Sequence, residues 1–166
     1  MEFETVIRNR HATRKFSEKK IEKDKLEKIL EAGRLAPTAK NNQPIKIYVV
    51  EKKIEELDKA TPCRYNAQTV LVVCANQKEA FQKKNHSTYE MDAVIVATHM
   101  MLEATNLGIA NIWIEMFEEE SLRNILNIPD NLTPICLLPI GYEVEDTPIS
   151  PNHNVRKPLE EIVEYR

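Results

Sequence analysis

Glycine is scarce in this chain, with only three among its 166 residues. A main-chain phosphate cradle such as G-x-G-x-x-G needs clustered glycine, because only glycine lets backbone N–H groups approach a phosphate closely. Gly33, Gly108 and Gly141 lie too far apart in the sequence to build one. Any phosphate that the protein binds must therefore be held mainly by side chains, and arginine guanidinium groups suit that task best.

Cysteine is also sparse, and its pattern argues against a metal site or a disulfide framework. Cys63, Cys74 and Cys136 are odd in number and form no C-x-x-C pair. Cys74 and Cys136 stand inside apolar runs, so we expect both to be small core residues. The four histidines show no H-E-x-x-H or other close pairing. The sequence therefore predicts no bound metal.

The chain has little excess charge of either sign, with a formal net charge of −3. A general nucleic-acid binder needs positive charge spread over a whole face, so we expect no nucleic-acid partner. The acidic N-terminus lacks the apolar region of a secretion signal. The longest apolar segment, residues 89–107, carries Asp92, His99 and Glu103, which argues against a membrane span. We therefore expect a cytoplasmic protein with no membrane contact.

Strand-like and helix-like segments alternate along the chain. The patterns predict strands at residues 46–50, 69–74, 109–115 and 135–140, and helices at 25–35 (capped by Asp24), 53–60, 89–107 and 118–126. The proline-rich stretch 148–158 should be extended. No repeat, linker or low-complexity stretch divides residues 1–166, so we expect a single domain. These elements predict an α+β fold, with a central sheet covered by helices.

The segment 89–107 is apolar on too many sides for a helix at the surface of a monomer. Its apolar residues from Met91 to Leu102 cannot all lie on one stripe. We expect some of them, such as Met101, to contact a second subunit. The alternative is a helix buried wholly inside one chain, which also occurs in larger cores.

Three separated polar clusters stand out. The first is the basic run from Arg8 to Lys15, the second is the loop at residues 36–44, and the third spans residues 154–157. Together they offer guanidinium groups for a phosphate and amides for the edges of a heterocyclic ring. Taken singly, each is also typical of a solvated helix face or a turn-rich connection. The basic run alone would fit a small anion-binding module that meets a nucleic acid or a protein.

Five motifs follow one another in a fixed order. They are Arg8-Asn9-Arg10-His11-Ala12-Thr13-Arg14-Lys15-Phe16, Pro37-Thr38-Ala39-x-Asn41-x-Gln43-Pro44, Asn106-Leu107-Gly108 through Ile114, Pro139-Ile140-Gly141-Tyr142 and Arg156-Lys157-Pro158-Leu159. In this order and spacing they resemble the nitroreductase family of FMN-dependent NAD(P)H oxidoreductases. The resemblance implies a central mixed β-sheet covered by helices, and a homodimer whose FMN sites are shared between subunits.

The resemblance also assigns roles to individual residues. Arg10 would contact the FMN phosphate, Arg14 the N1/O2 edge of the isoalloxazine ring, and the backbone of Glu115 the flavin N5, while Arg156 would close over the phosphate. His11 would either contact the ribityl or phosphate group or only fix its loop. The partner chain would supply the loop that begins at Pro37. The full implied set is Arg10, His11, Ala12, Arg14, Pro37, Thr38, Ala39, Asn41, Gln43, Glu115 and Arg156.

Three further expectations concern the pocket. Ala12 stands where the family usually has serine, so one hydroxyl contact of about 1 kcal/mol is lost. The lone Trp113 is expected in the sheet core rather than stacked on the flavin. The chain is short for the family, so the pocket should be open.

The implied activity is ping-pong hydride transfer from NADH or NADPH, through flavin N5, to a nitroaromatic, quinone or flavin-type acceptor. The chemistry belongs to the cofactor, so no side chain is expected to act as a catalytic acid or base. The alternative is an FMN-binding protein that stores the cofactor or senses it without turnover of its own. The sequence alone favours neither nicotinamide.

Overall fold

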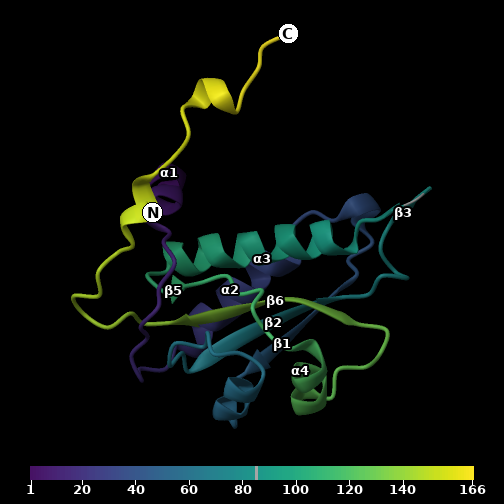
Figure 1. Ribbon diagram of the computed structural model, residues 1–166, viewed down its shortest axis with the longest axis horizontal. Coiled ribbons are helices and arrows are strands. Elements are labelled where there is room, and N and C mark those ends of the chain that lie inside the picture. Colours follow the sequence, from purple (N-terminus) through teal and green to yellow (C-terminus); the bar gives the residue numbers. More distant parts are fainter. Residues whose placement is uncertain (85) are drawn as a thin grey trace.

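The protein is described by a computed structural model that covers residues 1–84 and 86–166. Its centre is a four-stranded sheet of strand order β1-β2-β6-β5, in which all three ladders are antiparallel. The strands are β1 (Ile45–Val50), β2 (Thr69–Ala75), β6 (Thr133–Gly141) and β5 (Ala110–Asn111). Figure 1 shows the sheet lying below a long helix, α3.

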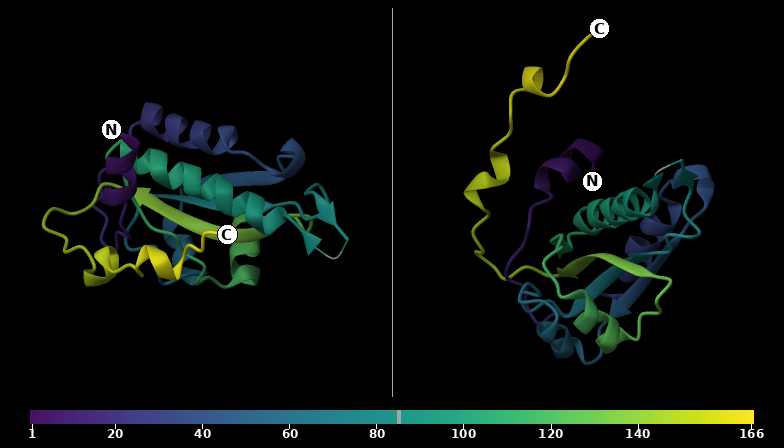
Figure 2. Two further views of the ribbon diagram at one scale, coloured as in Figure 1. Left: turned by 90° about the horizontal axis from the view of Figure 1, so that it is seen from above. Right: turned by 45° about the vertical axis from the view of Figure 1, so that its right-hand side comes forward.

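Helices lie on both faces of this sheet (Figures 1 and 2). Helices α2 (Lys23–Leu35) and α3 (Tyr89–Asn106) cover one face, α4 (Glu119–Leu126) lies on the other, and α1 (Phe3–Asn9) packs against α3. Short 3-10 turns lie at Ala39–Asn41, Ile54–Lys59, Pro151–Asn154 and Leu159–Glu161. A small hairpin pairs β3 (Gln82–Lys83) with β4 (His86–Ser87). None of the helices in the described part of the chain is long and apolar enough to cross a membrane.

Alternating side chains of β2 divide the core into two layers. Leu71 and Val73 point to one face and pack with α2 and α3, whereas Val70 and Val72 point to the other and pack with α4 and the turn at Ile54–Lys59. Every residue of β2 is buried. Both faces of the sheet are therefore covered, which explains why its central strands read as continuous apolar runs.

Gly33 lets α2 and α3 approach each other closely. A Cβ atom at this position would lie 2.8 Å from Cγ of Met100 on α3. The helix accepts the lower intrinsic helix propensity of glycine, and the two backbones gain contact in return. This contact fixes α3 against the sheet, and α3 in turn forms one wall of the candidate site.

The expected α+β fold is confirmed, and several element boundaries differ. The first long helix begins at Lys23 after Glu22, so Asp24 lies inside it. Residues 54–59 form a 3-10 turn. The strand expected at 109–115 shortens to β5 plus one isolated bridge between Ile114 and Leu137. Ile112 N–H donates to the Pro139 carbonyl, and Pro139 has no N–H to return the bond.

Among residues 1–84 and 86–166, the parallel pairing of the expected mixed sheet is limited to one bridge. Ala12, just after α1, pairs with Asn111 in parallel, outside the four-stranded ladder. The N–H of Thr13 donates to the Asn111 carbonyl at 3.1 Å. The sheet is therefore antiparallel, and the bridge places the basic run beside its β5 edge.

Helix α3 is only partly buried by its own chain. Met91 and Val94 are 49% and 42% exposed, so the alternative of a helix wholly buried in one chain does not describe it. Met101 was expected to face another subunit, and the structure corrects this: it is only 8% exposed and packs in the core between α3 and the sheet. The apolar surface that remains open on α3 lies around Met91 and Val94.

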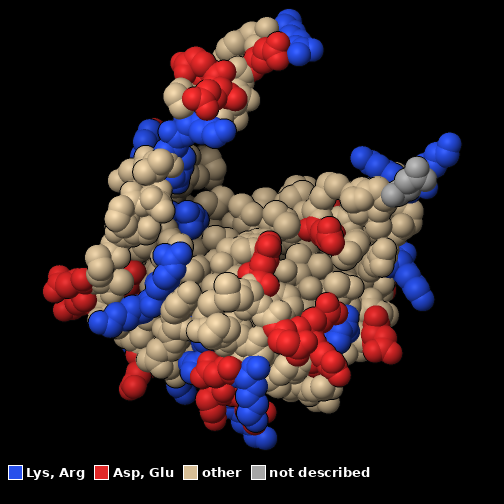
Figure 3. All heavy atoms as spheres, viewed as in Figure 1, with Lys and Arg blue, Asp and Glu red and all other residues tan. Residues whose placement is uncertain are grey.

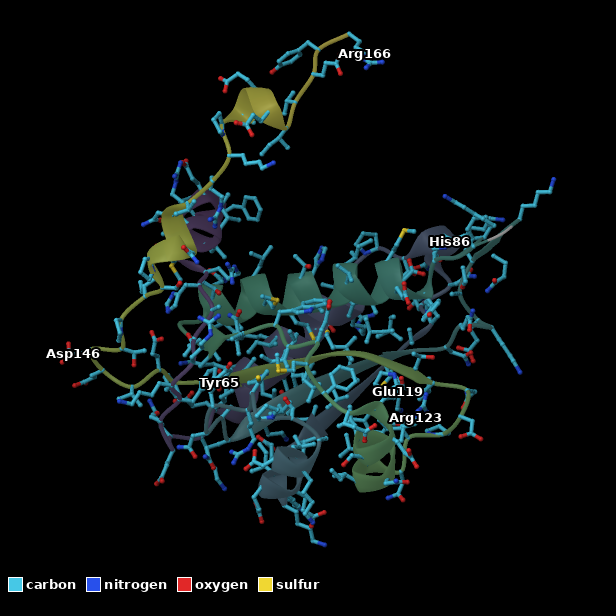
Figure 4. The ribbon with its side chains drawn as sticks, viewed as in Figure 1. Tyr65, His86, Glu119, Arg123, Asp146 and Arg166 are labelled. Carbon is cyan, nitrogen blue, oxygen red and sulfur yellow. The ribbon has the colours of Figure 1, made fainter. Side chains whose placement is uncertain are left out.

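Residues 148–166 extend away from the sheet beside α1, which itself packs against α3, and we call α1 and this tail together the arm (Figure 2). Figure 4 marks Arg166 at the free end of the arm and His86 at the opposite end of the molecule. The proline-rich segment is extended as expected, apart from the turn at Pro151–Asn154. Val155, Leu159 and Ile162 are each more than 60% exposed. The arm therefore carries apolar side chains with little to pack against.

Candidate functional site

An open cavity of about 520 Å³ lies between the arm and α3. Its polar lining includes Arg10, Thr98 and Glu115, and its apolar walls include Val94 and Trp113. Figure 3 shows the molecule hollowed beside the arm. The volume falls within the range that small-molecule and cofactor sites occupy. The structure thus brings together two positions that are 105 residues apart in the sequence, Arg10 and Glu115.

Arg10 and Arg156 are brought close enough to repel each other. Arg10 is half-buried, and its pKa is lowered first by this burial and then by the positive charge of Arg156. Among the described residues, no carboxylate lies within ion-pair distance of either guanidinium. Arg156 Nη1 instead donates to the carbonyl of Val155 at 2.7 Å. Two adjacent, uncompensated guanidinium groups form a setting that an anion would stabilise.

His11 stabilises the loop that carries Arg10. Its Nδ1 donates to the Asn9 carbonyl at 3.0 Å, and its Nε2 lies 3.1 Å from Oε2 of Glu143, which follows β6. The side chains of His11 and Glu143 are 19% and 24% exposed. Of the two roles left open by the sequence, this geometry supports the fixing of the loop.

Ala12 lies in the bridge to Asn111, beside the β5 edge. Next to it, the Thr13 hydroxyl oxygen and the Asn111 Oδ1 are buried and have no hydrogen-bond partner in the part of the chain that the structure describes. Asn111 uses its Nδ2 to donate to the Met101 carbonyl at 3.1 Å and to the Thr105 hydroxyl at 3.0 Å. The backbone that follows Arg10 is therefore tied to both β5 and α3.

Arg14 is exposed. Among the described residues, it is not one of those that line the cavity of Arg10 and Glu115. It lies next to Tyr65. The pKa of Tyr65 is raised, mainly by its hydrogen bond with Cys63 and by burial, and the neighbouring Arg14 partly opposes this shift. Thr61 Oγ1 donates to the Met116 carbonyl at 2.7 Å, so this segment also touches the chain that follows Glu115.

Tyr65 and Cys63 are site neighbours that sequence reasoning missed. They lie in a segment with no recognisable motif, and Cys63 drew attention only as an unpaired cysteine. Tyr65 has a left-handed backbone conformation, with φ of 52°, which is unusual for a bulky residue. Only the fold shows that this turn lies beside Arg14.

The loop from Pro37 to Gln43 lies elsewhere. Ala39 N–H donates to Oδ1 of Asp92 at 2.8 Å, which places the loop at the N-terminal end of α3. Thr38 and Gln43 line a different cavity, of about 230 Å³, between α2, α3 and β1. Within one chain, the structure therefore separates this loop from Arg10, Glu115 and Arg156.

The loop is exposed and yet tightly shaped. Asn41 and Gln43 both have left-handed backbone conformations, with φ of 56° and 51°. The N–H of Gln43 donates to the Thr38 hydroxyl at 3.0 Å, and its side chain donates to the Asn41 carbonyl at 3.1 Å. Such backbone geometry costs free energy and is common where a loop presents groups to a ligand or partner.

Trp113 combines two environments. One side packs against the core around α3, as the sequence predicts, while the other lines the cavity. Its Nε1 donates to Oε1 of Glu115 at 3.1 Å. The packing against the core agrees with the expectation, and the contact with the cavity is an additional feature. In the described part of the chain, no group of three or more His, Cys, Asp or Glu side chains is placed to hold a metal ion.

Comparison with known proteins gives a consistent family assignment. The family model described as "Nitroreductase family" matches residues 7–63 and 61–142. A candidate NADH dehydrogenase/NAD(P)H nitroreductase from Archaeoglobus fulgidus is 31% identical over 150 residues, which cover 85% of each chain. A solved nitroreductase family protein from Clostridium difficile 630 is 37% identical, with a TM-score of 0.92 over 99% of this chain and 98% of that one.

A second solved structure bears on the cofactor. It is an FMN-dependent nitroreductase from Clostridium difficile R20291, 26% identical to this chain, with a TM-score of 0.78 over 96% of both chains. These matches extend over nearly all elements described above, and the family model covers the loop of Arg10, the loop from Pro37 and the segment of Glu115. The chain belongs to the nitroreductase family.

Proposed function

We propose that the protein is an FMN-dependent NAD(P)H oxidoreductase of ping-pong mechanism. The observation that carries this proposal is the meeting of Arg10 and Arg156, which have no carboxylate partner among the described residues, at the edge of a cavity with apolar walls. A phosphorylated heterocycle has the matching chemistry, an anionic end and a flat apolar ring. The family membership of the chain and its FMN-dependent relative point to the same cofactor.

The residues of the chain then have separate tasks. Arg10 and Arg156 hold the phosphate, while Val94 and Trp113 supply apolar walls for the ring and keep water from it. Arg14 places positive charge near the pyrimidine edge, and the backbone of Glu115 faces N5. His11 and Ala12 shape the loop that carries Arg10 and Arg14. When bound, FMN supplies the hydride chemistry between NADH or NADPH and a nitroaromatic, quinone or flavin-type acceptor.

The proposal includes a homodimer, because one chain does not gather the whole implied set. The loop with Pro37, Thr38, Ala39, Asn41 and Gln43 lies at the far end of α3 from the arm. A second copy would supply it, and the same contact would cover the exposed surface around Met91 and Val94 on α3. Each subunit is a single domain over residues 1–166, since both core layers share β2 and β6.

Anaerobic reduction tests the activity directly. The protein is loaded with FMN, mixed with NADH or NADPH without oxygen, and followed by its visible flavin absorbance. We expect the absorbance to bleach with at least one nicotinamide and to return when a nitroaromatic, a quinone or free flavin is added.

Two other outcomes correspond to the competing functions. A yellow protein that neither nicotinamide reduces would identify a storage or sensor protein. A colourless protein that fails to bind FMN would leave the anion-binding module, in which the arginines meet a nucleic acid or a protein instead.

A further inference from the structure

The tail residues 148–166 have a single hydrogen bond to the rest of the described chain. It joins Nε2 of His153 to the carbonyl of Arg8, at 3.0 Å. The other hydrogen bonds and ion pairs of this tail are internal, such as that from the His153 N–H to the Ser150 carbonyl. Since a carbonyl oxygen only accepts, the imidazole Nε2 must carry the proton. His153 is therefore the tether of the tail.

The hydrogen bond of His153 lies close to Arg156 in the chain. The turn at Pro151–Asn154 carries His153, and Ser150 caps it by accepting from the Asn152 N–H at 3.3 Å. Arg156 follows three residues after His153, and its Nη1 lies 3.5 Å from the Asn152 carbonyl of the same turn. On the other side of the tether, Arg8 precedes Arg10 by two residues. One hydrogen bond thus joins the two backbone segments that present the guanidinium groups.

A second histidine, His11, lies beside His153 where the tail meets α1. The rings of His11 and His153 lie edge to face, with centroids 6.0 Å apart and an interplanar angle of 77°. His11 donates to the Asn9 carbonyl and pairs with Glu143, at the start of the chain that leads to the tail. The carbonyls of Arg8 and Asn9, immediately before Arg10, are therefore each bound by a histidine.

We propose that His153 is a positioning residue for phosphate recognition: by binding the Arg8 carbonyl, it holds the tail so that Arg156 lies opposite Arg10. This inference rests on the proposed FMN function. His153 itself need not touch the cofactor. Its contribution should depend on the phosphate, so it should appear with FMN and be absent with riboflavin, which has the same ring and no phosphate.

The test compares the affinities of FMN and riboflavin, titrated by flavin fluorescence, in His153→Leu, His153→Gln and wild-type protein. Leu removes the donor, and we expect FMN affinity to fall about two- to tenfold, the effect of one net hydrogen bond, with riboflavin affinity unchanged. Gln keeps an N–H donor and should restore most of the loss. His86→Leu removes a histidine at the opposite end of the molecule and should leave both affinities unchanged (Figure 4).

A double-mutant cycle separates positioning from a general structural effect. In an Arg156→Ala background, His153→Leu should cause no further loss of FMN affinity, because there is no guanidinium left to place. Additive losses in the cycle, or equal losses for FMN and riboflavin, would overturn the positioning role. So would wild-type FMN affinity in His153→Leu.

The same panel distinguishes this inference from the proposed function. If Arg10→Ala and Arg156→Ala both leave the ratio of FMN to riboflavin affinity unchanged, the phosphate site is wrong and the inference fails with it. If those two variants lower the ratio and His153→Leu does not, the phosphate site stands and only the positioning role is wrong.

Discussion

The body of the molecule, residues 10–147, and its arm differ in how far their apolar side chains are buried. In the body, β2 is buried along its whole length, and helices seal both faces of the sheet. In the arm, Phe3, Val155 and Ile162 are each more than 60% exposed, and one hydrogen bond links residues 148–166 to the rest of the described chain. Burial within one chain explains the body apart from the exposed surface of α3 around Met91 and Val94. Burial does not explain the position of the exposed side chains in the arm. The arm instead lies beside the cavity that Arg10 lines.

The residues implied to hold FMN are divided along the same lines. Arg10 and Arg156 belong to the arm and the loop next to it, while the loop from Pro37 to Gln43 is fixed to the body through Asp92. If a second copy completes the site, the body of one chain meets the arm side of the other. The body and the arm would then form the two halves of one interface.

The largest effect should come from Met91→Asp. Met91 is 49% exposed near the start of α3, so one chain should tolerate the change, and an acidic residue there also suits the helix dipole. In a dimer that covers this surface, the new carboxylate would be buried and unpaired. We expect dimer formation and FMN binding to fall together, by roughly 100-fold or more.

Sedimentation measures the first property, and flavin absorbance of the purified protein measures the second. Asn124→Asp, which adds the same charge to the exposed surface of α4, serves as the control and should change neither. A Met91→Asp protein that sediments as a monomer and still binds FMN stoichiometrically would contradict the shared site. Met101→Asp would be a poor substitute, because Met101 is already buried in the core of one chain.

Arg10→Ala and Arg156→Ala test the arm alone. Each removes a charge-assisted contact to the phosphate, worth about 1.5–3 kcal/mol, so FMN affinity should fall roughly 10- to 150-fold. Riboflavin affinity should not change. Arg8→Ala is the matched control, since the Arg8 side chain is 74% exposed and pairs with Glu4 instead. Equal FMN affinity in all three variants would remove the phosphate assignment.

Arg14→Ala should act on the potential of the cofactor more than on its binding. Removing a positive charge near the pyrimidine edge makes the charge that develops on reduction less stable. Because Arg14 is exposed, solvent screening keeps the effect small, and we expect the midpoint potential to fall by about 20 mV, equivalent to about 1 kcal/mol for two electrons. Lys15→Ala controls for a neighbouring charge. A wild-type potential in Arg14→Ala would show that Arg14 lies away from that edge.

The sequence predicts the body well, for a physical reason. Buried strands and helices leave continuous or periodic apolar patterns, and β1, β2, β6, α3 and α4 were all predicted to within about two residues. The strand at 109–115 was predicted too long, because backbone pairing with Pro139 is not visible in hydropathy. Helix α2 was also predicted to within two residues, and it begins before the predicted start because Lys23 and Asp24 are exposed and leave no apolar signal.

The site is less visible in the sequence than the fold. Motifs named Arg10 and Glu115, and the structure gathers these two at one cavity. No pattern could show that His11 pairs with Glu143, or that Tyr65 lies beside Arg14, since these contacts join segments that are far apart and carry no periodicity. These contacts depend on how the fold brings loops together, so they can be identified only from the three-dimensional structure.

The smallest predicted effect concerns Tyr142, which directly follows β6 in the segment that leads to residues 148–166. Tyr142, next to β6, donates to Glu22, and this hydrogen bond is the main reason why the pKa of Glu22 is lowered to about 2. Lys25 Nζ donates to the Tyr142 hydroxyl at 2.8 Å. This contact lies within the body, whereas the hydrogen bond of His153 joins residues 148–166 to α1 within the arm.

Because the folded pKa of Glu22 is depressed, its contribution to stability is present above the unfolded value of about 4.3 and is lost as the pH falls towards about 2. Tyr142→Phe should therefore lower the free energy of unfolding at neutral pH, and its deficit relative to wild type should shrink between those two pH values. Urea unfolding at a series of pH values measures this. Glu22 is exposed, so the deficit should be small, and FMN affinity at neutral pH should not change. A deficit that is independent of pH would show that Tyr142 acts by packing against Lys19 and Lys25 instead.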